Sequence, residues 1–73
     1  MDRAFMRRSI GRNIRHQRQL SGLQETVLAS HLGIPLQRLR KYESGGDSPT
    51  CDELIALARL FRCPVDALCR EAP

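Results

Sequence analysis

The chain has little of what marks secreted, membrane and disulfide-rich proteins. Its three cysteines, Cys51, Cys63 and Cys69, are odd in number and have no C-x-x-C spacing, so we expect reduced thiols rather than an extracellular disulfide framework. No apolar run approaches the roughly 18 residues of a membrane span, and no signal-peptide pattern is present. We therefore expect a cytoplasmic protein without a membrane partner.

The residues that carry out chemistry are equally sparse. The two histidines, His16 and His31, fall on different predicted helices, and neither has cysteines at a metal-ligand spacing. A chain of 73 residues forms one small domain that buries only about 60% of its unfolded surface, which leaves little room for a deep active site. We expect no metal, no cofactor and no enzymatic activity, whereas binding to a large partner is compatible with this size.

The charge is unevenly distributed along the chain. Residues 1–42 hold nine arginines and lysines against two acids, whereas residues 43–73 hold three against six. A basic half of this kind is typical of a domain that binds a polyanion such as nucleic acid. A solvated, arginine-rich helix face is the alternative interpretation.

The apolar residues follow helical spacing throughout, and no alternating strand pattern is sustained, so we predict an all-α fold. The predicted helices cover residues 9–20, 24–32, 36–42, about 50–61, and 64–69. Thr50-x-x-Glu53 predicts a capping box at the start of the fourth helix. Residues 1–7 and 71–73 are expected to fray. The predicted core is Ile10, Ile14, Leu28, Ala29, Leu32, Leu39, Tyr42, Leu54, Leu57, Ala58, Phe61, Val65 and Leu68.

The second and third predicted helices are joined by only three residues, Gly33, Ile34 and Pro35. Ala29 and Gly33 are small and four residues apart, which lets the two helices cross closely, and Ile34 then fills the space under the turn. This arrangement is typical of a helix-turn-helix, whose second helix projects as a ridge that fits a major groove about 12 Å wide. An ordinary αα-hairpin is the alternative.

The order and spacing of many residues together resemble the Cro/C1-type (XRE) helix-turn-helix family of phage repressors and small bacterial regulators. The matching residues are Ile14-Arg15-x-x-Arg18-x-x-x-Gly22, Leu28-Ala29-x-x-Leu32-Gly33-Ile34, Leu39-x-x-Tyr42-Glu43-x-Gly45, Pro49, Leu54, Leu57-Ala58, Phe61 and Val65-x-x-Leu68. The resemblance implies a compact five-helix bundle of the lambda-repressor-like type over residues 9–69, with a flexible segment over 1–8 and a tail over 70–73.

The resemblance also implies a function. It is that of a sequence-specific regulator of transcription that binds double-stranded DNA, as a dimeric repressor with the third helix in the major groove. One small module makes too little contact to be specific alone, and a two-fold dimer that reads two half-sites corrects this. The fifth helix, with Val65 and Leu68, is the implied dimer surface.

The resemblance assigns base contacts to the third helix, at Leu36, Gln37, Arg38 and Lys41. The chemistry of these side chains fits, because glutamine pairs with adenine, lysine or arginine pairs with guanine, and leucine meets a thymine methyl group. The alternatives are a surface glutamine at Gln37, phosphate contact or solvation for the cations, and a place at the edge of the core for Leu36.

Contacts to the DNA backbone are assigned to a second set of residues. They are Gln24, Arg40, Ser44, Gly45, Gly46, Arg12 and Arg15. The small residues after the third helix are expected to let amide groups approach phosphate, with a plain turn as the alternative. Arg18 and Glu43 are assigned to a structural salt bridge that sets the angle of the third helix.

Three residues depart from the family pattern. One of them, Gln17, stands at a position that is often apolar in the family, so the first helix is expected to pack more loosely. Glu25 stands where the family usually has a glutamine that donates to phosphate, and its carboxylate repels phosphate. Pro35 replaces the usual hydroxyl cap of the third helix and offers neither a side-chain oxygen nor an amide. The alternative function is therefore a protein-interaction or antitoxin-type module that has the same fold and weakened DNA binding.

Overall fold

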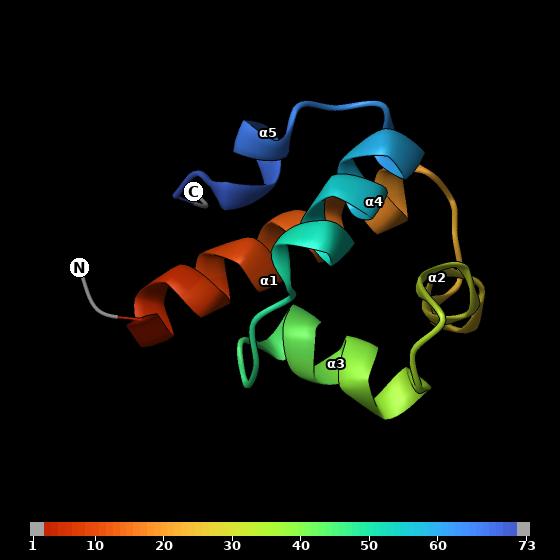
Figure 1. Ribbon diagram of the computed structural model, residues 1–73, viewed down its shortest axis with the longest axis horizontal. Coiled ribbons are helices and arrows are strands. Elements are labelled where there is room, and N and C mark those ends of the chain that lie inside the picture. The colour runs from red at the N-terminus through yellow and green to blue at the C-terminus, as the bar shows by residue number, and fades with distance from the viewer. Residues whose placement is uncertain (1–2, 72–73) are drawn as a thin grey trace.

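The computed structural model describes residues 3–71, and within them it contains five α-helices and no strand (Figure 1). The helices are α1 (Arg3–Leu20), α2 (Glu25–Leu32), α3 (Leu36–Ser44), α4 (Cys51–Phe61) and α5 (Val65–Cys69). The predicted all-α, five-helix fold is confirmed. No helix among residues 3–71 is long and apolar enough to cross a membrane.

Helix α1 begins six residues before the predicted start at Ser9, so the prediction of a frayed segment there was wrong for residues 3–7. The extra turns have a packing partner that lies far away in the sequence. Ser9 and Gly11 are buried, and the Arg7 Nε donates a hydrogen bond to the Gly45 carbonyl at 3.3 Å. The helix is therefore extended by contact with the end of α3. Residues 1–2 and 72–73, which belong to the predicted flexible ends, lie outside the described residues.

The predicted capping box is present at the start of α4 and also contacts α3. Thr50 Oγ1 accepts from the Glu53 amide at 3.1 Å, and Glu53 Oε1 accepts from the Thr50 amide at 2.9 Å. The Tyr42 hydroxyl donates to the same Glu53 oxygen at 2.8 Å. Burial and this hydrogen bond raise the pKa of Tyr42 to about 12, so the phenol stays protonated as the donor that joins α3 to α4.

The five helices enclose one hydrophobic core. Its buried members are Ile10, Ile14, Leu28, Ala29, Leu39, Tyr42, Leu57, Ala58, Phe61 and Leu68. Leu32 and Leu54 are half-buried against it. Val65, predicted as core, is 38% exposed, whereas Leu68 is fully buried. The implied dimer surface on α5 therefore cannot include Leu68.

The arrangement leaves α3 open on one side (Figure 1). Helix α2 is seen end-on at the right of the view, and α3 lies across the bottom, far from α5. The turn between α2 and α3 is made by Gly33, whose φ of 68° is left-handed and suits glycine. The outer face of α3 is consequently a ridge that no other helix covers.

Candidate nucleic-acid interface

The outer face of α3 is built by helical periodicity. Leu39 and Tyr42 point inward and are 0% and 1% exposed, which fixes the rotation of the helix and turns the polar positions outward. The exposed residues of this face are Gln37, Arg38, Arg40, Lys41 and Ser44. The ridge therefore carries three cations and an amide.

Three of the four predicted base-contact residues lie together. Gln37, Arg38 and Lys41 line a shallow hollow on one flank of α3, with Pro35 and Asp47 as its other walls. Leu36 is half-buried and packs against the core, as its alternative interpretation holds, so only part of its side chain reaches the surface. Asp47 was not predicted, because its position beside α3 depends on how the following loop folds back.

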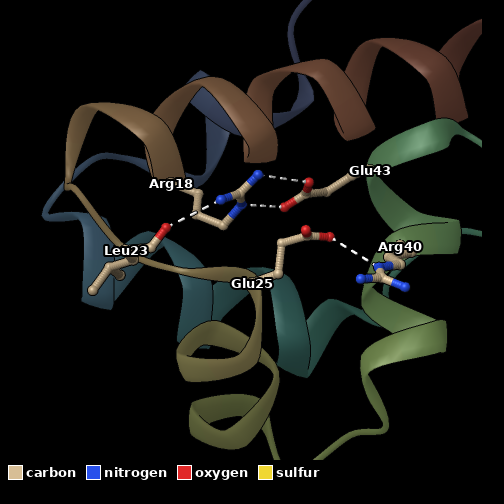
Figure 2. A network of polar contacts seen from close by, with 5 residues as sticks. All are labelled: Arg18, Leu23, Glu25, Arg40 and Glu43. Atoms are coloured by element: carbon tan, nitrogen blue, oxygen red, sulfur yellow. Dashed lines mark hydrogen bonds and ion pairs between the residues drawn. The ribbon is translucent and has the colours of Figure 1, made fainter.

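The other flank of α3 faces the start of α2 and the end of α1. A second hollow there is lined by Arg15, Arg18, Glu25, Arg40, Glu43 and Ser44. Within it, Arg40 Nε donates to Glu25 Oε2 at 3.2 Å (Figure 2). This pair is exposed, with 61% of the Arg40 side chain accessible. Glu25, which departs from the family pattern, thus pairs with Arg40, which was predicted to contact phosphate.

Arg18 and Glu43 form a bidentate ion pair between α1 and the end of α3 (Figure 2). The two nitrogen–oxygen distances are 2.7 and 3.2 Å, and the side chains are only 12% and 7% exposed. Arg18 also donates to the Leu23 carbonyl at 3.0 Å. The hydrogen bond that Arg18 donates to Glu43 raises the pKa of Arg18, so the guanidinium stays charged. The pair ties α3 to α1, and the bond to Leu23 ties it to the chain that leads into α2.

The hydrogen-bond donors at the end of α3 and in the loop after it are occupied by carbonyl groups of α3 itself. The Gly45 amide donates to the Tyr42 carbonyl at 3.2 Å, and the Gly46 amide donates to the Lys41 carbonyl at 2.8 Å. The Ser44 hydroxyl donates to the same Lys41 carbonyl at 3.1 Å. These donors cap the C-terminus of α3. The expected approach of free amides from Gly45 and Gly46 to phosphate is therefore not what this geometry offers.

The remaining predicted backbone contacts lie on the surface. Gln24 is exposed at the N-terminus of α2, and its side chain makes no capping hydrogen bond there. Arg12 and Arg15 are exposed on α1. No group of three or more histidine, cysteine or acidic side chains that could hold a metal ion occurs within residues 3–71. Gln24, Arg12 and Arg15 thus add polar and cationic side chains to the described surface.

Comparison with known proteins identifies the family to which this arrangement of helices belongs. The family model described as "Helix-turn-helix" matches residues 14–68. The cryptic phage CTXphi transcriptional repressor RstR of Vibrio cholerae is 32% identical over 60 residues, which are 82% of this chain and 54% of that protein. An uncharacterized HTH-type transcriptional regulator of Sinorhizobium medicae is 30% identical over 64 residues, covering 88% of this chain and 46% of that protein.

A solved structure shares the fold. The restriction-modification controller protein C.AhdI from Aeromonas hydrophila superposes with a TM-score of 0.76 at 21% identity, covering 85% of this chain and 94% of that one. The chain spans about half the length of the curated relatives it matches. It belongs to the Cro/C1-type helix-turn-helix family.

Proposed function

We propose that this protein binds double-stranded DNA sequence-specifically and represses transcription in the cytoplasm as a homodimer. The observation that carries the proposal is the uncovered ridge of α3. It presents Gln37 and Lys41 one helical turn apart, while Arg18–Glu43 on one side and Tyr42–Glu53 on the other fix its orientation. A rigid, cationic helix of this kind fits direct readout in the major groove.

Binding-site selection from random duplex DNA, scored at two salt concentrations, tests this function. We expect enrichment of a two-fold symmetric site with half-sites about one helical turn apart, and an affinity that falls steeply as salt rises. A protein-interaction module would instead show no enriched site and no salt-dependent DNA binding. The relatives named as transcriptional regulators support the first outcome for this chain.

Gln37→Ala is expected to relax the sequence preference. The Gln37 side chain is exposed at the start of the ridge, and a bidentate contact to adenine contributes about 1–3 kcal/mol of discrimination. Selection with the variant should lose information at one position of each half-site and keep it elsewhere. An unchanged site would remove Gln37 from the set of base readers.

Glu25→Gln is expected to tighten DNA binding. The substitution removes a carboxylate from the surface that is proposed to face the DNA phosphates. It also releases Arg40, whose Nε donates to Glu25 Oε2 at 3.2 Å. An exposed ion pair is worth about 0.2–1 kcal/mol, so the affinity should rise by up to roughly fivefold. Arg40→Gln is the matched control and should weaken binding. Equal or weaker binding by Glu25→Gln would show that α2 does not approach the DNA backbone.

A further inference from the structure

We propose that α1 carries a phosphate-binding stripe that consists of Arg8, Arg12 and Arg15. Its outer end is Arg8, in the turns of α1 that come before residue 14, where the match to the family model begins. The inference rests on the proposed function, since its ligand is one strand of the DNA that α3 reads. Arg12 and Arg15 were already predicted to contact the DNA backbone. Arg8 is the new member, because the sequence predicted a flexible segment over residues 1–8 and no DNA contact there. The family model matches from residue 14 onward, so Arg8 and Arg12 lie outside the residues that it matches.

The three arginines share one face of α1. They are spaced i, i+4 and i+7, which brings their side chains into line on a helix. All three are exposed, and none has a carboxylate within ion-pair distance among residues 3–71. They differ in this from Arg18 and Arg40, which are held by Glu43 and Glu25. The stripe is therefore free to bind an external anion.

The stripe borders the C-terminal end of α3. At its outer end, Arg8 lies directly against Gly45, where a Cβ would come within 2.7 Å of the Arg8 Cγ and 2.9 Å of its Cα. At its inner end, Arg15 shares a hollow with Arg40 and Ser44. Figure 1 shows the first turns of α1 and the loop after α3 at the same end of the molecule. The arginines thus continue the cationic surface of α3 onto α1.

The stripe matches the dimensions and chemistry of a DNA strand. Seven residues of helix span about 10 Å, and a strand advances about 3.4 Å per nucleotide along the duplex axis, so the stripe runs alongside about three nucleotides. Guanidinium groups bind phosphate with paired, charge-assisted hydrogen bonds. The amides of Gly45 and Gly46 are occupied within the loop. Arg8 therefore supplies at this loop the phosphate contact that the amides do not.

Salt titration of DNA binding by Arg8→Gln tests the proposal. The wild type and the variant are titrated on one selected duplex, and the slope of log affinity against log salt is compared. Loss of one phosphate contact should reduce the magnitude of the slope by about 0.9, with the enriched site unchanged. Arg59→Gln, an exposed arginine on α4, removes the same charge away from α3 and should leave the slope as it is. Arg8→Lys should keep the wild-type slope.

The outcomes separate this proposal from the proposed function. A reduced slope for Arg8→Gln, with Arg59→Gln at the wild-type value, supports the stripe. Wild-type slopes for both variants, or equal reductions in both, overturn the stripe while leaving DNA binding by α3 intact. Absence of salt-dependent DNA binding by the wild type overturns the proposed function and the stripe together. Thermal melts of the variants show that each is folded.

Discussion

Arg18→Ala is expected to lower the melting temperature by roughly 12 °C or more. The variant leaves the Glu43 carboxylate, which is 7% exposed, without its bidentate partner. Stranding one charge of a buried pair costs about 3–5 kcal/mol, and each kcal/mol shifts the melting temperature of a domain this size by about 4–8 °C. The loss of the hydrogen bond to the Leu23 carbonyl acts in the same direction. Thermal unfolding followed by circular dichroism measures the change.

Two further variants show that burial, rather than ion pairing as such, causes this loss. Arg40→Ala removes an ion pair of the same chemistry whose arginine is 61% exposed, and it should cost no more than about 1 kcal/mol. Replacing both members of the buried pair, as Arg18→Met with Glu43→Leu, should recover much of the stability, because no unpaired charge remains. A wild-type melt for Arg18→Ala would mean that the bridge contributes nothing to folding.

The fold was largely predictable because its signals are local. Apolar spacing, glycine stops and the Thr50–Glu53 capping box lie within a few residues of the features they specify, and they gave the number and order of the helices. The start of α1 was missed for the opposite reason. The turns before Ser9 are stabilised by contact with Gly45, 38 residues beyond Arg7, and no periodicity within residues 1–8 reports that contact.

The candidate site was predictable only where a single helix determines it. The period of α3 correctly turns Gln37 and Lys41 outward, since Leu39 and Tyr42 must be buried. The pairing of Glu25 with Arg40 and the approach of Asp47 to α3 depend on turns that bring separate segments together. The occupied amides of the loop depend on its backbone conformation in the same way. Residue type and spacing therefore do not predict these contacts.

Helix α1 approaches the backbone at the end of α3 closely at Gly11, and Gly11→Ala is expected to destabilise the protein by roughly 2 kcal/mol. A Cβ at this position would overlap the Tyr42 carbonyl oxygen and lie 2.7 Å from the Glu43 carbonyl oxygen. Both are backbone atoms at the end of α3, so relief requires one helix to move. Alanine normally stabilises a helix interior by about 0.5–1 kcal/mol relative to glycine, whereas overpacking costs about 1–3 kcal/mol or more, and here the steric cost exceeds the gain.

Gly11→Ala should therefore lower the melting temperature by about 10 °C, although it improves the helix propensity of α1. Gly46→Ala is the matched control, because its Cβ would meet nothing nearer than 3.6 Å, and its melt should stay near that of the wild type. The same displacement would tilt α3, since Gly11 contacts the carbonyls beside the Arg18–Glu43 bridge. Folded Gly11→Ala protein should then discriminate its DNA site less well than the wild type. A melting temperature equal to or above that of the wild type would show that α1 and α3 are not in backbone contact.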